Sequence, residues 1–363
     1  MRATLFASML GIFAVTLQAG SGDTPVWNAK GAAAYMDQRA GWWSTWKSAA
    51  RDHDTFCVSC HTALPYALAR PALRSVLAEQ GPSANERQLL DNVRKRVKLW
   101  SEVKPLYPGD KSAESRGSEA VLNALILVTN DAAGKVMTDE SRLAFDNMWA
   151  LQLKTGDKKG ALEWMNFHYE PWEADDSQYW GATLAAIAVG TAPKEYRATP
   201  EVQANLKLLV QYLRQAQQGQ PLGNRVGLLW ASTKIPGLLQ PAERTAIVNE
   251  ILAKQQEDGG WSSASLISTT WKRKDASPQE TRSDGYGTGL ITFVLEQAGA
   301  KAQLSRALAW LSKNQDKTGG FWPAWSLNKQ RDPASDIGKF MSDAGTAYSV
   351  LALMGAAGNP GTE

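Results

Sequence analysis

One short pattern recurs along the chain and constrains its fold more than any other feature. A glutamine near the end of a helical stretch is followed by glycines and then by an aromatic residue. Two copies are clear, at 310–322 and 251–261, and weaker copies lie at 35–43, 149–164 and 212–217. Internal self-similarity of this kind indicates a repeat architecture. The pattern also accounts for part of the high tryptophan content, which is 15 residues.

The residue types of the repeat suggest a mechanical role. We expect the glutamine amide to donate hydrogen bonds to the unsatisfied carbonyls at the end of its own helix. The glycines then turn the chain, and the aromatic ring packs back on the helix end. The repeat is therefore predicted to be a structural clamp.

Two kinds of helical segment alternate between these copies. Apolar segments rich in small residues run at 63–73, 117–128, 178–189, 226–235, 285–297 and 345–355. Longer, more charged amphipathic segments run at 30–39, 86–100, 141–153, 201–217, 242–255 and 302–314. Small residues suit helices crowded inside a ring, and charged faces suit an outer wall. The sequence predicts an all-α fold, an (α/α)6 toroid of six inner and six outer helices, in one domain over 20–363.

The repeats at 251–261 and 310–322 resemble the QW repeats of the terpenoid cyclase superfamily, in particular those of squalene-hopene cyclases. The resemblance covers most of 28–357 and is good in two copies. It implies a toroid with an apolar central cavity that takes an isoprenoid-like or lipid ligand. Other toroids of six helix pairs, such as polysaccharide lyases, lack these clamps and fit the sequence less well.

The first 19 residues have the pattern of a secretory signal peptide. A single Arg2 precedes an apolar run at 5–17, which ends at small residues by Ala19. We expect cleavage there and a periplasmic protein; an uncleaved anchor is the alternative. No later apolar run approaches the roughly 20 residues of a membrane span. The formal net charge is only +3 with no basic stripe, which argues against a nucleic-acid partner.

The only two cysteines form a Cys-x-x-Cys-His motif, Cys57, Cys60 and His61. This is the signature of covalent haem c attachment, with the thiols bonded to the haem vinyl groups and the imidazole as an iron ligand. Export supports this interpretation, because c-type haem is attached outside the cytoplasm. A disulfide, or a zinc site completed by a carboxylate, remains an alternative.

The long connections of the chain all lead from an outer helix to the next inner one, at 154–177, 260–284 and 316–343. In a ring of helix pairs such loops emerge on one face, where binding sites are usually found. Cys57, Cys60 and His61 precede the first inner helix. We therefore expect them on that face, at the mouth of the central cavity.

Acidic residues begin three inner helices, at 173–176, Asp284 and Asp343. The simplest interpretation is helix capping. The first group, Glu173-Ala174-Asp175-Asp176, is also similar to the Asp-x-Asp-Asp motif of class II terpene cyclases. The resemblance implies that Asp175 is a general acid, since crowded carboxylates retain a proton. The chain departs from the family in its first residue, Glu173, and in having one toroid where such cyclases close their cavity between two.

A haem iron has a second axial position, for which His168 and Met165 in the loop before Asp175 are candidates. An open or water-bound iron is equally compatible with the sequence. The basic segment 271–275 is a candidate partner for haem propionates or a redox protein, although most such runs are only solvated.

Three functions follow from these features. The first is an exported haem protein that transfers electrons with a redox partner protein, or oxidises an apolar isoprenoid-like ligand at the cavity mouth. The second is a terpene cyclase or isomerase that uses Asp175, with Cys57 and Cys60 in a disulfide. The third is a binding module without catalysis. The sequence leaves open whether the protein is an enzyme, because one fold hosts many chemistries.

Overall fold

The computed structural model describes residues 27–134 and 136–357; the predicted signal peptide at 1–19 lies outside them. The described residues form thirteen α-helices and one antiparallel hairpin, β1 (Ala50–Arg51) and β2 (Thr55–Phe56). The prediction of a helical chain is confirmed, and the hairpin is an addition that the sequence did not suggest. Among these helices, none is long and apolar enough to cross a membrane.

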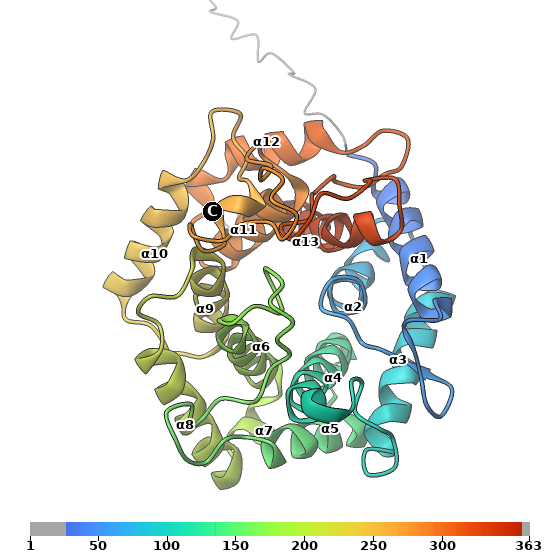
Figure 1. Cartoon of the computed structure of the whole chain (residues 1–363), viewed down its shortest axis with the longest axis vertical. Helices are drawn as coiled ribbons and strands as arrows, with labels where there is room; N and C mark the ends of the chain where they lie inside the picture. Colours follow the sequence, from blue (N-terminus) through green and yellow to red (C-terminus); the bar gives the residue numbers. More distant parts are fainter. Residues whose placement is uncertain (1–26, 135, 358–363) are drawn as a thin grey trace, which may run out of the picture.

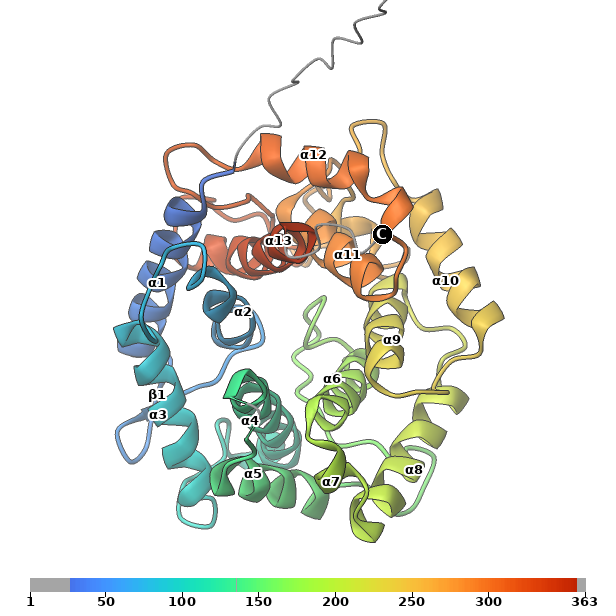
Figure 2. The same cartoon turned by 180° about the vertical axis from the view of Figure 1, so that it is seen from behind.

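The helices fall into an inner and an outer set (Figure 1 and Figure 2). The inner helices are α2 (Ala63–Ala69), α4 (Ser112–Gly134), α6 (Ser177–Thr191), α9 (Leu222–Lys234), α11 (Gly285–Gln297) and α13 (Phe340–Ala357). The outer helices are α1 (Ala29–Thr45), α3 (Ala84–Lys98), α5 (Asp139–Ala150), α8 (Pro200–Gln215), α10 (Pro241–Ala253) and α12 (Ser305–Asn314). A short helix, α7 (Lys194–Arg197), lies between α6 and α8. Consecutive inner helices contact one another, and α13 contacts α2.

The inner helices are buried on nearly every side. All residues from Ser177 to Val189 of α6 and from Gly285 to Glu296 of α11 are buried. Small residues permit this crowding: a Cβ added to Gly181 would lie 2.1 Å from the ring of Trp164. Helices without a polar face are stable only where neighbours cover them completely, which explains the small-residue segments of the sequence.

The repeat forms a clamp as predicted, but the tryptophan indole, and not the glutamine amide, donates the hydrogen bond to the end of the outer helix. The indole N–H of Trp322 donates to the carbonyl of Leu311 at 2.7 Å, and that of Trp261 donates to Ile251 at 2.8 Å. The tryptophan, which is fully buried in both copies, therefore satisfies the end of the preceding outer helix.

The glutamine amide instead holds the glycine turn. Gln315 Nε2 donates to the carbonyl of Gly320 at 2.7 Å, and Gln255 Nε2 donates to that of Gly259 at 2.8 Å. The turn glycines have positive φ, +75° at Gly320 and +93° at Gly259, and both lie against the next outer helix. The repeat thus satisfies the end of one outer helix and also joins that helix to the next outer one.

Candidate functional site

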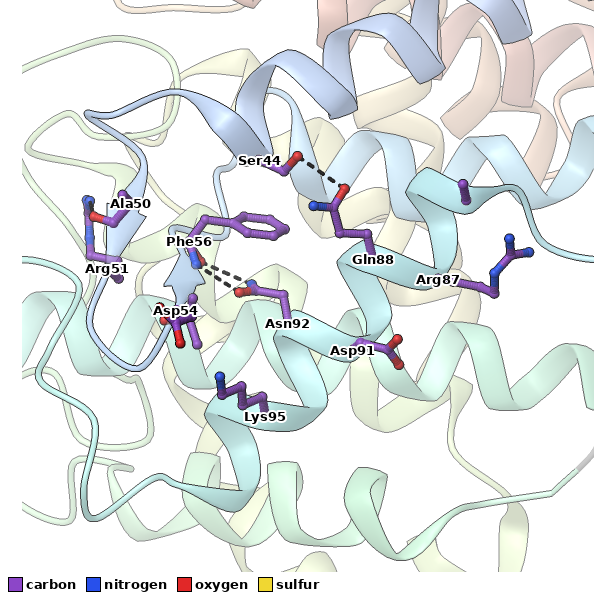
Figure 3. Close-up of a pocket in the computed structure, with 12 residues that line it drawn as sticks. Ser44, Ala50, Arg51, Asp54, Phe56, Arg87, Gln88, Asp91, Asn92 and Lys95 are labelled. Carbon is purple, nitrogen blue, oxygen red and sulfur yellow. Dashed lines mark hydrogen bonds between the residues drawn. The ribbon is translucent and has the colours of Figure 1, made fainter.

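The Cys-x-x-Cys-His segment is held in place by its neighbours. Asn92 of α3 exchanges two hydrogen bonds with the backbone of Phe56, at 2.8 and 3.0 Å, directly before Cys57 (Figure 3). The indole N–H of Trp43 donates to the carbonyl of Cys57 at 2.7 Å. The hydroxyl oxygen of Ser59 accepts hydrogen bonds from the first backbone N–H groups leading into α2. The loop is therefore fixed at both ends.

Both cysteines are free thiols in this structure, not the disulfide that the sequence allowed. Cys57 is 6% exposed and Cys60 is 9% exposed. Burial raises the pKa of Cys57 to about 12 and raises that of Cys60 well above its usual value. The charge of Glu173 also raises both pKa values. Such thiols are neutral and unreactive at pH 7.

The imidazole of His61 is fixed between aromatic rings. It stacks on Phe340 with ring centroids 3.9 Å apart and meets the edge of Trp43 at 4.9 Å. Burial, together with the charge of Arg39, lowers the pKa of His61 to about 3. The ring is therefore neutral near pH 7, which is the state that binds a metal.

His61 lines a cavity of about 280 Å³. The walls come from the long loops before α2, α4, α6 and α13, as expected for the face that carries the inner-helix N-termini. Most of the lining is aromatic or apolar: Trp43, Trp46, Tyr107, Phe167, Tyr169, Trp172, Ile337, Phe340 and Met341. Tyr107 and Ile337 are also exposed, so they lie where the cavity opens.

Two glutamates from one loop also line this cavity, Glu170 and Glu173. Burial raises the pKa of Glu173 to about 7. Burial, followed by the charges of Asp176 and Asp175, raises the pKa of Glu170 to about 8. Neither side chain accepts a hydrogen bond from any residue that the structure describes. Both carboxyl groups are thus able to hold a proton near neutral pH.

Glu170 was not found from the sequence. The Glu-Pro-Trp-Glu run at 170–173 shows it within an aromatic loop, but its 5% exposure arises only from tertiary packing. The signal that could have found it is the density of aromatic residues around two closely spaced carboxylates.

The acidic residues that follow are placed differently. The Asp175 carboxylate is 76% exposed, lies 2.7 Å from Nδ1 of His168 and accepts a hydrogen bond from Asn166. The hydrogen bond from Asn166 holds the pKa of Asp175 below its usual value, so at neutral pH the group is an ionised surface carboxylate. Burial raises the pKa of Asp176, which does not cap α6 with its side chain. Of the predicted acidic group, only Glu173 lines the cavity with His61.

The candidate second axial ligands do not line the cavity either. His168 is exposed and paired with Asp175, and Met165 is 4% exposed in the packed interior. In the basic segment, Arg273 is buried and donates to the carbonyls of Ser326 and Pro278, which makes it structural.

Helix capping is observed at one of the three predicted starts. Asp284 accepts a hydrogen bond from the backbone N–H of Gly287 at 2.8 Å, as a cap does. Asp343 instead lies inside α13 and accepts hydrogen bonds from the side chains of Tyr35, Arg39 and Thr62.

A larger hollow, of about 720 Å³, lies elsewhere, between the β1–β2 hairpin and α3 (Figure 3). Its walls carry charges of both signs, from Arg51, Asp54, Asp91 and Lys95. No residue of the Cys-x-x-Cys-His motif lines this hollow, whereas His61 lines the aromatic cavity, and the two share no residue. We therefore take the aromatic cavity as the functional site.

The donor types of the motif are those of a c-type haem, because two unbonded thiols and an imidazole lie in one segment. Of the three residues only His61 lines the aromatic cavity; Cys57 and Cys60 do not. A zinc site finds less support, because within 27–134 and 136–357 no three His, Cys, Asp or Glu side chains are grouped to hold a metal.

Comparisons with known proteins give a fold and no family. No family model matches the chain, and no curated protein matches it. Among solved structures, the chain is similar to two point variants of a glycosidase, both with a TM-score of 0.50. They are 15% and 14% identical to it, and the match covers 89% of this chain and 98% of theirs. At this identity the likeness shows a shared helical fold. The resemblance to terpenoid cyclases stays a prediction.

Proposed function

We propose that this chain is an exported (α/α)6 toroid protein that binds one haem c at the aromatic cavity. Cys57 and Cys60 would hold the haem through thioether bonds, and His61 would be the axial ligand. The haem would supply reversible one-electron chemistry, in electron transfer with a redox partner protein or in oxidation of an apolar, isoprenoid-like ligand.

The main support for this proposal is the hydrogen bonding and the neutral charge of the His61 imidazole. Its Nδ1 lies 2.8 Å from the hydroxyl of Thr62, while Nε2 has no hydrogen-bond partner among the described residues. The ring is neutral and borders the cavity. A neutral imidazole with one nitrogen engaged and the other free is the form in which histidine binds iron.

The residues around the cavity have clear tasks in this proposal. Trp43 and Phe340 fix the plane of the His61 ring. The aromatic walls exclude water and offer an apolar surface to a haem face or to a ligand. Glu173, whose pKa is raised to about 7 by burial, lines the cavity and is able to hold a proton there.

An absorption spectrum tests the proposal. The chain should be exported in a host with a haem-attachment system and examined as its pyridine haemochrome. We expect a c-type spectrum that persists after acid and organic extraction. Cys57→Ala combined with Cys60→Ala should abolish it, whereas His61→Ala should retain covalent haem but alter its axial ligation. A colourless wild-type protein under these conditions would contradict the proposal.

The two glutamates favour a second candidate, acid catalysis on a ligand in the same cavity. Glu170 and Glu173 line it without side-chain partners among the described residues, and their raised pKa values, about 8 and about 7, let each hold a proton near neutral pH. Glu173 would then take the general-acid role that the sequence assigned to Asp175, whose exposed and ionised carboxylate suits it poorly.

This candidate predicts a colourless, active protein. Polyprenoid cyclisation or isomerisation, and hydrolysis of glycosides in view of the shared fold, are the activities to assay. Glu173→Gln should remove activity, while Asp175→Asn should retain most of it. Equal loss in both variants, or activity unchanged in Glu173→Gln, would count against Glu173 as the acid.

A further inference from the structure

Thr62 lies between His61 and a buried carboxylate. Its hydroxyl oxygen is 2.8 Å from His61 Nδ1 and 2.7 Å from Asp343 Oδ2. Thr62 is 3% exposed and Asp343 is 6% exposed, so bulk water does not compete for these bonds. The three groups form a continuous hydrogen-bonded chain from α13 to the imidazole.

The direction of each hydrogen bond follows from what Asp343 can accept. Its Oδ1 accepts from the hydroxyl of Tyr35 and from Nε of Arg39, both at 2.8 Å. A second Arg39 nitrogen, Nη2, donates to Oδ2 at 3.1 Å. A carboxylate that meets a guanidinium and a phenol in this way is an acceptor at every contact. The Thr62 hydroxyl must therefore give its one hydrogen to Asp343.

The tautomer of His61 follows from this direction. Because the hydrogen of Thr62 is used, its oxygen can only accept from His61, so Nδ1 carries the proton. A neutral imidazole has one N–H, which leaves the lone pair on Nε2. An isolated histidine side chain favours the opposite tautomer, so the Thr62–Asp343 pair imposes this one.

We propose that Thr62 and Asp343 are positioning residues that hold His61 as the Nδ1–H tautomer and increase the electron donation of Nε2 toward a haem iron. The effect on the haem iron rests on the proposed function, whereas the tautomer of His61 is set by protein residues and does not depend on haem. An acceptor on the second ring nitrogen raises the basicity of a ligating imidazole, and here that acceptor is the Thr62 hydroxyl, which itself donates to the Asp343 carboxylate. It therefore stabilises the oxidised iron and lowers the reduction potential.

Thr62 is the residue to change, because among the described residues its hydroxyl makes hydrogen bonds only to His61 and Asp343. It precedes α2 but makes no side-chain capping bond, which Ser59 provides instead. Asp343 also joins α13 to α1 through Arg39 and Tyr35, so its removal would disturb the fold. Thr62→Val removes the hydroxyl with little change of shape, and Thr62→Ser is the matched control that retains it.

The first measurement uses the haem-free protein, made as the Cys57→Ala, Cys60→Ala double variant. Long-range ¹H–¹⁵N spectra report the tautomer of each of the three histidines, with His61→Gln identifying the His61 signals. We expect Nδ1–H at His61 both with Thr62 in place and in Thr62→Ser, and a shift toward Nε2–H in Thr62→Val. An Nε2–H tautomer with Thr62 in place, or a Thr62→Val spectrum identical to that of its parent, would overturn the inference.

The second measurement uses the haem-loaded protein. The reduction potential of Thr62→Val should shift to more positive values, and that of Thr62→Ser should stay close to the wild type. Equal potentials in all three proteins would overturn the haem part of the inference. A colourless protein in which the tautomer still responds to Thr62→Val would remove the proposed function and leave the tautomer assignment standing.

Discussion

Asn28 and Gln315, 287 residues apart in sequence, exchange two hydrogen bonds. The backbone N–H of Asn28 donates to Gln315 Oε1 at 2.6 Å, and Gln315 Nε2 donates to the carbonyl of Asn28 at 3.0 Å. Asn28 caps the N-terminus of α1, and Gln315 follows the last residue of α12. One side chain therefore connects the first outer helix to the last.

Gln315→Ala should destabilise the protein because it leaves the backbone N–H of Asn28 and the buried carbonyl of Gly320 without their partners. We expect the free energy of unfolding to fall by about 1–3 kcal/mol. Denaturant unfolding followed by circular dichroism measures it. Gln38→Ala, at an exposed position of α1, is the control and should change the value little. Equal stability of the two variants would argue against the clamp.

Gly320→Ala should lower the stability of the fold more than Gly219→Ala, because both glycines have positive φ but only Gly320 is closely packed. Gly320 has φ +75°, and an added Cβ would lie 2.3 Å from the carbonyl carbon of Gly31. Gly219 has φ +81° with nothing within 4 Å, so Gly219→Ala isolates the backbone cost of about 1–2 kcal/mol. We expect Gly320→Ala to cost about 1–3 kcal/mol more. Similar midpoints of thermal unfolding for both variants would refute this.

Much of the helical fold was predictable because inner and outer helices have different compositions. The predicted segment 178–189 corresponds to α6 (Ser177–Thr191), and 201–217 corresponds to α8 (Pro200–Gln215). The clamp was recognised from its glutamine, glycines and tryptophan. Its donors were assigned wrongly, because the sequence does not show that the glycine turn lies against the next outer helix.

The motif Cys57, Cys60 and His61 is local in sequence, and the loop lengths predicted the face on which His61 lines the cavity. Its role as a haem site stays a prediction, and features that depend on packing could not be predicted. Asp343 was interpreted as a helix cap, and only the packing of α13 against α1 and α2 turns it toward Thr62. The burial of Glu170 and the exposure of Asp175 likewise arise from how the loop before α6 folds back over the cavity.

The two thiols should be unreactive in the folded, haem-free chain. Both are buried and their pKa values are raised, so little thiolate is available to attack a disulfide reagent. With protein made without a haem-attachment system, we expect slow reaction with an aromatic disulfide reagent at pH 8 and rapid reaction in guanidinium. Cys57→Ala should halve the denatured signal. Rapid reaction of the native protein would show that the segment is open.

Stability should fall as the pH rises from about 4.5 to about 8. The folded-state pKa of Glu170 is raised from 4.5 to about 8, so the unfolded chain releases this proton first. The stabilisation is complete below pH 4.5 and is lost as the pH rises through the folded-state pKa. Glu170→Gln should reduce the fall by up to about 5 kcal/mol, since the pKa shift is from 4.5 to about 8. Exposed Glu102→Gln is the control. Parallel pH profiles for wild type and Glu170→Gln would contradict this.

The intact mass of the exported protein, measured after denaturation, shows whether a haem is covalently bound to this chain. We expect a polypeptide that carries the added mass of one haem, absent from the Cys57→Ala, Cys60→Ala double variant made in the same host. A wild-type polypeptide of unmodified mass, from a host that attaches haem to a known c-type cytochrome in parallel, would contradict it.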